Sequence, residues 1–346
     1  MTVVSSYTSW QPLEEVIVGR AYPADYFDFI ENAQVRNQLQ QILDETQEDL
    51  DNLAQTIAQF GATVLRPDLP PKDRFQQSQV QGQGAPLPPI TPRDWQITLG
   101  TKLLRVLAMP ELDRICDHYQ TVQPGSVINP HGHSHWNPHC VLNGASASCI
   151  VRVGTDIFFD NSDFLKPHQT RWIVDNVLDS RYRVHEAITD GHGDAVFAIL
   201  KPGVLLSSKH DVNLDLARDF PGWDVLKIWD SSIWAAMEVG KFKYESNPGA
   251  WYVQGQTPTD EFKEFVNTYL TKWTGFVAET VFDVNCLVLD EQHVIFSAYN
   301  REVFDYCAKH HIEPIVSELR HSYFWDGGIS CCTQDIRRRG GLETYL

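Results

Sequence analysis

Residues 149–159 (CIVRVGTDIFF) contain two short apolar runs on either side of a Gly-Thr turn, and the fold can be worked out from this stretch. Two such runs joined by a tight turn predict a β-hairpin. A helical pattern follows over residues 165–178, and a further apolar run over residues 182–185 predicts a third strand. The stretch therefore predicts a unit with the order strand, strand, helix, strand.

The same order of elements returns along the chain. Residues 195–228 and 287–316 each contain a hairpin, a helical pattern and a third strand, and degenerate copies cover residues 14–66 and 95–120. Units that each leave an apolar face unburied must stack or close on one another. We therefore expect an α/β fold in which about five ββαβ units form one domain over residues 1–346. The alternative is an ordinary two-domain α/β protein.

The first copy contains the clearest helix of the chain. Apolar residues recur at spacings of three and four from Val35 to Phe60, which places them on one face of a long helix. Gly61 stands where a C-terminal cap belongs, and residues 62–65 predict a returning strand. The stretch 76–90 is rich in Gln, Gly and Pro, so we expect an extended loop without secondary structure.

Composition narrows the classes of partner. The 346 residues include 28 Lys and Arg against 45 Asp and Glu, which gives a net charge of −17. This balance excludes a nucleic-acid binder that relies on a basic face. No apolar run is long enough to span a membrane, and the first residues lack a signal-peptide pattern. We therefore expect a cytoplasmic protein that contacts neither nucleic acid nor membrane.

The seven cysteines are odd in number, scattered and without a CxxC pair, so they are interpreted as free thiols. Residues 326–335 (DGGISCCTQD) place two glycines before a cysteine pair, and such a turn can present a thiol beside backbone N–H groups. A buried structural cysteine is the alternative. These features alone do not choose between Cys331 and Cys332.

Two further segments place titratable groups at the start of a predicted strand. In residues 190–197 (DGHGDAVF), an extended chain would project His192 and Asp194 to the same side, about 6–7 Å apart. That arrangement suits an acid/base beside an anion that binds a cation, although a solvated turn histidine is equally compatible. Asp94 similarly precedes the predicted strand over residues 96–99.

Alternating histidines form a third candidate segment: His131, His133, His135 and His139, followed by Cys140. Such residues can bind a transition metal. Metal ligation needs fixed geometry, and a loop interrupted by Gly and Pro does not favour it. A substrate-lining or solvated loop is the preferred interpretation, and we expect neither a metal nor a cofactor.

Together these segments resemble the amidinotransferase family of the guanidino-modifying, or pentein, superfamily, almost from end to end. The resemblance is carried by residues 9–19 (SWQPLEEVIVG), 92–94 (PRD), 191–207 and 327–340. It implies a five-bladed α/β propeller. When the segment is aligned on Thr333 and Asp335, the family's nucleophile falls on Cys331.

The resemblance also implies a reaction and roles for individual residues. An amidino group would pass from an arginine-like guanidino donor to an amine acceptor through a covalent amidino-cysteine on Cys331. His192 would act first as an acid and then as a base, while Asp94 and Asp194 would hold the guanidinium in charge-assisted hydrogen bonds. Small molecules would be the partners, and homodimers are common in the family.

Two departures from the family pattern bear on this assignment. Residues 143–149 (NGASASC) contain no acid where family members place a carboxylate that orients the histidine. Residues 208–211 contain no arginine for the donor's carboxylate, so Lys209 is the candidate stand-in. A guanidino hydrolase, or a guanidino-binding protein without turnover, is therefore the alternative function. A metal enzyme built on the histidine segment is a less favoured one.

Overall fold

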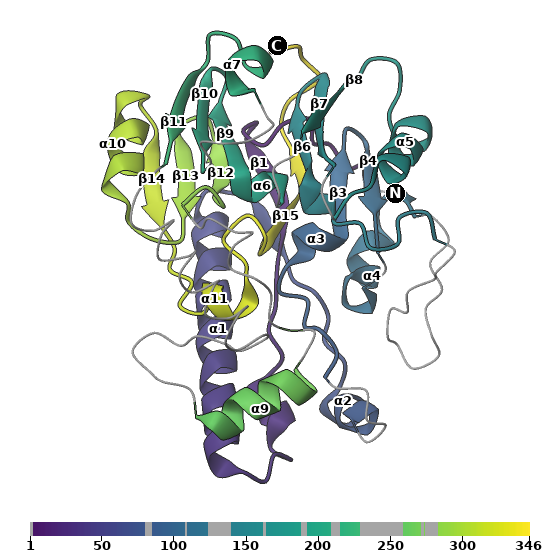
Figure 1. The fold of residues 1–346 in the computed structure, drawn as a ribbon, viewed down its shortest axis with the longest axis vertical. Coiled ribbons are helices and arrows are strands. Elements are labelled where there is room, and N and C mark those ends of the chain that lie inside the picture. The colour runs from purple at the N-terminus through teal and green to yellow at the C-terminus, as the bar shows by residue number, and fades with distance from the viewer. Residues whose placement is uncertain are drawn as a thin grey trace.

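The computed structural model describes residues 3–79, 85–107, 109–123, 140–161, 164–187, 192–208, 215–228, 259–270, 273 and 283–346. Within these ranges the chain forms five sheets of three strands each (Figure 1). Each sheet pairs two antiparallel strands and adds a third strand parallel to the middle one. In chain order of their middle strands, the sheets consist of β15 (Thr333–Arg338), β1 (Leu13–Val18) and β2 (Thr63–Leu65); β3 (Gln96–Leu99), β4 (Lys102–Arg105) and β5 (Thr121–Val122); β6 (Ile150–Val153), β7 (Asp156–Asp160) and β8 (Arg183–Ala187); β9 (Phe197–Lys201), β10 (Val204–Ser207) and β11 (Asp224–Lys227); and β12 (Leu287–Asp290), β13 (His293–Phe296) and β14 (Glu313–Val316).

A helix connects the middle strand of each sheet to its parallel neighbour, as a βαβ connection requires. These helices are α1 (Ala33–Gln59), α4 (Pro110–Cys116), α5 (Pro167–Asn176), α7 (Leu216–Asp219) and α10 (Arg301–Lys309). The remaining described helices are η1 (Ala24–Phe27), α2 (Lys72–Gln79), α3 (Pro92–Trp95), η2 (Ala147–Cys149), α6 (Gly193–Val196), α9 (Asp260–Tyr269) and α11 (Ser322–Trp325). The predicted repeat of ββαβ units is therefore confirmed.

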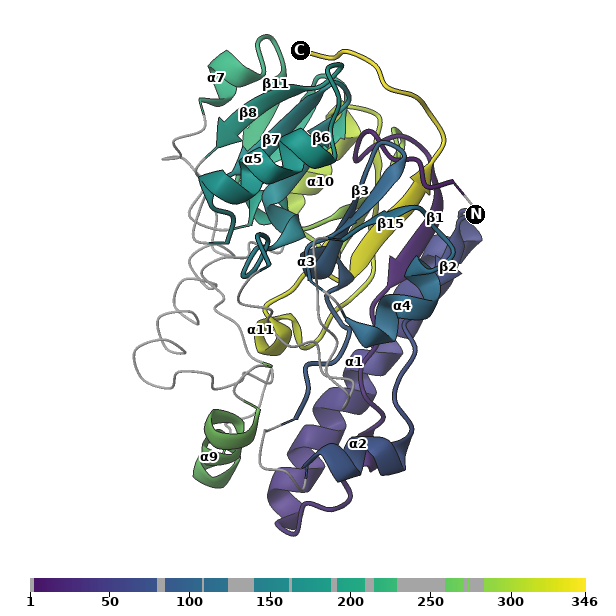
Figure 2. The ribbon, with the colours of Figure 1, turned by 90° about the vertical axis from the view of Figure 1, so that its right-hand side faces the viewer.

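The first sheet joins the two ends of the described chain. β15 runs antiparallel to β1, with Thr333 opposite Val18 and Arg338 opposite Leu13. Figure 2 shows the yellow C-terminal strand lying between the purple N-terminal strand and β3. The copy over residues 14–66 looks degenerate in the sequence because its first strand is supplied from the other end of the chain.

The long helix α1 forms where its periodicity predicts it. The side chain of Asn32 caps the helix by accepting from the backbone N–H groups of Gln34 and Val35. Gly61 follows the helix with a φ of 88°, a left-handed conformation that favours glycine. The apolar face is buried at Val35, Leu39, Ile42, Leu43, Leu50, Leu53 and Ile57. This face packs α1 against its own sheet and against α9.

Two local predictions are wrong. The stretch 76–90 is not wholly extended, because its first residues belong to α2, which is held in place by the buried ring of Phe75 against Tyr22 and Phe27. The strand predicted from residue 195 begins only at Phe197. The preceding residues form the helical turn α6, since the backbone N–H of Ala195 donates to the carbonyl of His192.

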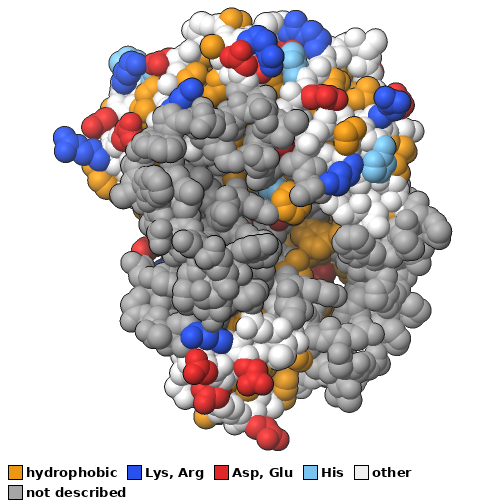
Figure 3. Space-filling view, viewed as in Figure 1, with side chains coloured by type: hydrophobic (Ala, Val, Ile, Leu, Met, Phe, Trp, Pro, Cys, Tyr) orange, Lys and Arg blue, Asp and Glu red, His pale blue; other side chains and the backbone are white. Residues whose placement is uncertain are grey.

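Two further features of the molecule are the distribution of charged side chains on one face and the apolar character of its helices. On the face shown in Figure 3, acidic and basic side chains are interspersed over the upper part, and acidic side chains gather at the lower end, where α1 and α9 lie. None of the helices in the described ranges combines the length and the apolar character of a membrane span.

Candidate functional site

The candidate site is built from equivalent positions of the five units. Each unit places one or two polar residues in the short turn or helix immediately before its first strand, and side-chain contacts join these residues in pairs. The turns α3, η2 and α6 precede β3, β6 and β9, while irregular turns precede β12 and β15. The residues concerned are Asp94, Ser146, Ser148, His192, Asp194, Asn285, Ser330 and Cys331. The repeat therefore brings residues from distant parts of the sequence to one place.

Cys331 lies in a tight turn that is closed by Gly328, whose carbonyl accepts from the backbone N–H of Cys332 at 3.0 Å. The thiol of Cys331 is buried, with 2% of the residue exposed. The side-chain amide of Asn285 holds this cysteine twice, because its Nδ2 donates to Sγ at 3.0 Å and its Oδ1 accepts from the backbone N–H at 3.1 Å. A Cβ at Gly328 would lie 2.7 Å from Asn285 Oδ1, so only glycine permits this approach.

The electrostatics at Cys331 oppose ionisation. Burial raises the pKa of its thiol well above the ordinary value, and the carboxylates of Asp194 and Asp94 raise it further. Cys332 differs in its surroundings, because it packs into the apolar core shared by α1 and its sheet. Burial raises the pKa of the Cys332 thiol to about 12. Burial and the two neighbouring carboxyl groups therefore disfavour the thiolate of Cys331 when no donor is bound.

Asp194 presents an unused acceptor at the site. The hydroxyl of Ser330 donates to its Oδ2 at 2.8 Å, whereas no described residue donates to its buried Oδ1. Burial raises the pKa of the Asp194 carboxyl, although Arg93, His192 and the Ser330 hydroxyl act in the opposite direction. Because α6 is helical, the extended geometry predicted for His192 and Asp194 is wrong. The two residues still reach the same site.

His192 lies beside Asp94, with 3.7 Å between its Nδ1 and Asp94 Oδ1. Ser146 donates to the same Oδ1 at 3.2 Å, and the hydroxyl oxygens of Ser146 and Ser148 are 2.5 Å apart. The ring of Phe164 meets the imidazole edge to face at 4.8 Å. The segment without an acid thus supplies hydroxyls that hold Asp94, and Asp94 is the carboxylate closest to the histidine in the described contacts.

A buried ionic cluster supports the turn that carries Cys331. Arg93 Nε donates to the carbonyls of Ser330 and Thr333, and its Nη2 lies 3.1 Å from Asp335 Oδ1. Asp335 is fully buried and is also paired with Arg152 and Arg338, at 2.7 and 2.9 Å. Despite burial, these arginines hold the pKa of the Asp335 carboxyl well below its usual range. A cavity of about 60 Å³ lies between this cluster and Asp194.

The structure brings some of the predicted site residues together, adds residues that were not predicted, and leaves others outside the described ranges. Asp94, His192, Asp194 and Cys331 are brought together, whereas Asn285, Ser330 and Arg93 were missed. Their signal was positional, since each residue lies in the turn before the first strand of a unit or beside such a turn. Lys209 and the histidines 131–139 lie outside the described residues. Among the residues that are described, no group of three or more His, Cys, Asp or Glu side chains is arranged to hold a metal ion.

Comparison with known proteins places this site in context. The chain matches no family model. An inosamine-phosphate amidinotransferase from Streptomyces glaucescens is 23% identical over 391 aligned positions, which cover 100% of this chain and 99% of the relative. An L-arginine:L-lysine amidinotransferase from Pseudomonas savastanoi pv. phaseolicola is 23% identical over 397 positions, which cover 99% and 96%.

Solved structures agree with these sequence relatives. The inosamine-phosphate amidinotransferase from Streptomyces griseus superposes with a TM-score of 0.66 at 20% identity, covering 100% of this chain and 99% of that one. A dimethylarginine dimethylaminohydrolase superposes with a TM-score of 0.53 at 13% identity, covering 93% and 99%. The chain therefore shares the α/β pentein fold of these two structures. Within it, this chain resembles the amidinotransferases over its whole length, which confirms the resemblance seen in the motifs.

Proposed function

We propose that this protein is an amidinotransferase that moves an amidino group from an arginine-like guanidino donor to an amine acceptor through Cys331. The observation that carries the proposal is the convergence of a buried thiol, two carboxyl groups and a histidine from different units. The full-length resemblance to amidinotransferases supports the same reaction. The proposal includes no cofactor.

The two carboxylates suit a guanidinium. Asp194 Oδ1 is a buried acceptor that no described residue uses, and Asp94 lies beside His192. A planar fork of N–H donors would satisfy both acids in charge-assisted hydrogen bonds. The donor's positive charge would also offset the effect of these acids on Cys331, so that the thiol would pass its proton to His192 and form the thiolate when the donor is bound. Lys209 would bind the donor's carboxylate.

The proposed reaction consists of two half-reactions, in which the amidino-cysteine forms and then breaks down. The Cys331 thiolate attacks the amidino carbon and forms a C–S bond; the C–N bond to the departing amine breaks as His192 donates a proton to that amine. In the second half His192 takes a proton from the incoming amine, which attacks the same carbon. The C–S bond breaks and the thiolate is restored. Asp94 would orient the imidazole, because its Oδ1 lies 3.7 Å from His192 Nδ1.

We further propose that the five units form one propeller domain, closed by the pairing of β15 with β1. Arg152 and Arg338 support this arrangement, because they belong to different sheets and both pair with Asp335. None of the seven cysteines, all of which lie in the described ranges, forms a disulfide, which suits the reducing conditions of the cytoplasm.

The test of the proposed function is whether the product depends on an acceptor. Incubation with arginine should release ornithine only when a primary amine is present, and mass spectrometry should detect the amidinated amine. The hydrolases of the same fold make acceptor-free turnover the principal alternative. Release of a ureido product or ammonia without any amine would replace transfer by hydrolysis. Tight guanidino binding with no product under either condition would leave a binding protein.

Asn285→Ala is expected to lower kcat by about 10²-fold with little change in KM, because the amide positions Cys331 without reaching the donor. Loss of the N–H donor should also raise the pKa of the thiol, so that the pH profile of iodoacetamide alkylation at Cys331 moves to higher pH. Alkylation rates against pH, read by peptide mass spectrometry, would measure this shift.

A matched control for this variant is Asn176→Ala, which removes a side-chain amide that bonds only to the exposed backbone of α5. It should change neither kcat nor the alkylation profile. An unchanged alkylation profile in Asn285→Ala, together with normal kcat, would remove Asn285 from the site.

A further inference from the structure

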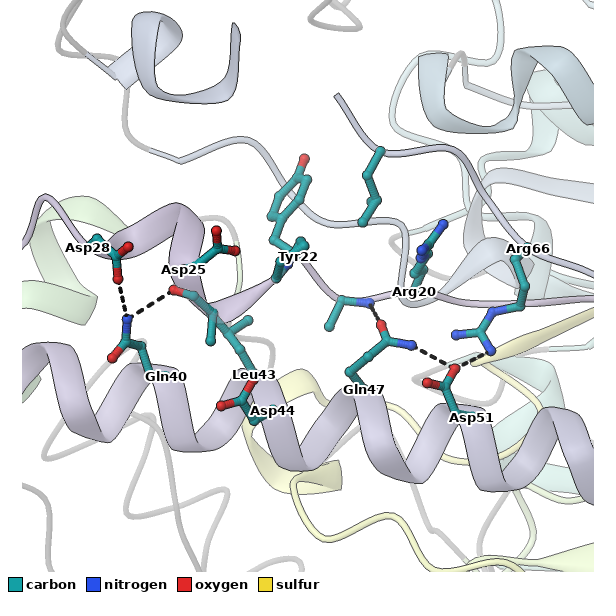
Figure 4. A pocket seen from close by; sticks show the side chains of 14 residues that line it. Arg20, Tyr22, Asp25, Asp28, Gln40, Leu43, Asp44, Gln47, Asp51 and Arg66 are labelled. Carbon is teal, nitrogen blue, oxygen red and sulfur yellow. Dashed lines mark hydrogen bonds and ion pairs between the residues drawn. The ribbon is translucent and has the colours of Figure 1, made fainter. Parts of the chain in front are cut away.

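A second groove lies between α1 and the two segments that leave the first sheet, residues 20–28 and 66–69 (Figure 4). Its volume is about 670 Å³, which is ample for a small ligand. None of the residues proposed to act on the guanidino group lines it. The groove is therefore a separate candidate site, lined by the two segments and by α1.

The floor of the groove is one polar stripe of α1. Gln40, Asp44, Gln47 and Asp51 recur at spacings of four, three and four residues, so they share a face beside the buried apolar one. Gln47 is fixed in this stripe, because its Oε1 accepts from the backbone N–H of Ala21 and its Nε2 donates to Asp51. The stripe thus has a defined geometry along the helix.

One end of the groove is basic. Arg66 Nη1 donates to Asp51 at 2.7 Å, but its Nε and Nη2 are buried and reach no acceptor among the described residues. Arg20 lies beside it, and its side chain makes a single hydrogen bond in the described part of the chain, to the carbonyl of Pro67 at 3.3 Å. Burial and the neighbouring charge of Arg20 both lower the pKa of Arg66. A bound anion would satisfy the open donors and relieve this repulsion.

The other end is acidic. Asp25 and Asp28 share one cation, since each lies 3.0 Å from Lys72 Nζ. Asp44 lines the groove between this pair and the basic end, and it forms no hydrogen bond or ion pair with any described residue. Burial and the charge of Asp25 raise the pKa of Asp44, which a bound cation would reverse. This end therefore favours a positive group.

The distance between the two ends limits the ligand. Asp44 and Asp51 are seven residues apart on α1, which corresponds to about 10 Å along the helix axis. We propose that the groove binds a short linear zwitterion, with its carboxylate at Arg20 and Arg66 and its protonated amine at Asp44. An amino acid with an amine at the end of its side chain, or a similar ω-amino acid, has this chemistry.

The probe is 6-aminohexanoate, which carries both charges on a five-carbon chain and lacks a guanidino group. Hexanoate and hexylamine are the probes that keep one charge each. Calorimetric titration of the whole protein should show binding of 6-aminohexanoate at least about tenfold tighter than binding of either single-charge probe. Equal affinity for hexanoate and 6-aminohexanoate would overturn the acidic half of the site, and no binding of 6-aminohexanoate would overturn the proposal.

Substitutions at the two ends of the groove test where 6-aminohexanoate binds. Arg66→Gln and Asp44→Asn should each weaken 6-aminohexanoate at least about tenfold, whereas the exposed controls Arg301→Gln and Asp260→Asn should not. Loss of the ion pair between Arg66 and Asp51 in Arg66→Gln could disturb folding. Asp44→Asn still tests the proposal in that case, because the Asp44 side chain forms no hydrogen bond or ion pair with any described residue. Asp194→Asn distinguishes this groove from the amine-acceptor site. Binding that is lost in Asp194→Asn but kept in Asp44→Asn would place the probe at the candidate active site and overturn the proposal.

Discussion

Replacing Cys331 with serine is expected to lower kcat/KM for amidino transfer by about 10⁴-fold or more, because a hydroxyl at this buried position replaces the only sulfur that Asn285 holds beside Asp194. The guanidinium carbon is a poor electrophile, since resonance spreads its charge over three nitrogens. A serine without a base in contact would not attack it. Steady-state rates with arginine and an amine acceptor measure the loss.

The accompanying observation is a covalent adduct. Intact mass of the wild-type protein, quenched during turnover, should increase by the mass of one amidino group, and the Cys331→Ser variant should show no increase. Cys332→Ser is the matched control, because its thiol lies in the apolar core and should not carry the adduct. An adduct located on Cys332, or turnover that survives Cys331→Ser, would contradict the assigned nucleophile.

Asp335→Asn is expected to give the largest loss of stability, about 3–5 kcal/mol in the free energy of unfolding. The substitution leaves Arg93, Arg152 and Arg338 in a fully buried cluster without a counterion. Because these arginines hold the folded pKa of Asp335 well below the unfolded value, the stabilisation is complete above about pH 4 and is lost only as pH falls through that lower pKa.

Urea unfolding at pH 7 would measure this loss. Asp179→Asn serves as the control, because Asp179 pairs with Arg181 at the surface, where both side chains are about half exposed or more. Its loss should change the free energy of unfolding by less than about 1 kcal/mol. If the two variants unfolded at the same urea concentration, Asp335 would not be the counterion that the buried cluster requires.

The repeated units could be predicted because each hairpin pairs two strands that follow one another directly in the sequence. The Gly-Thr turn at residues 154–155 and the apolar runs beside it fix the pairing of β6 with β7 within a few residues of sequence. The sheet that contains β1 could not be predicted in full. Its partner β15 comes from the other end of the chain, and no local pattern reports a pairing across such a distance.

Part of the candidate site could be predicted from the sequence, namely the residues whose side chains carry titratable or nucleophilic groups. Cys331, His192 and the two acids were identified by the motifs, but their geometry was not, because Gly193 opens a helical turn where the pattern indicated a strand. Asn285 gave no signal, since an asparagine before an apolar strand is ordinary turn chemistry. Its place in the candidate site becomes clear only when the turns before the first strands of the five units are compared, because each turn carries at least one polar residue.

The position of β15, the strand that pairs with β1, also limits when the candidate site can form during synthesis of the chain. Cys331 is directly followed by β15, so a nascent chain that has not yet emerged past Arg338 lacks both the pairing strand and the Asp335 counterion that organises the turn. The proposed nucleophile and the last described strand, β15, are thus synthesised together. A prematurely terminated chain would expose apolar surface for quality control to recognise, yet it would carry no organised nucleophile.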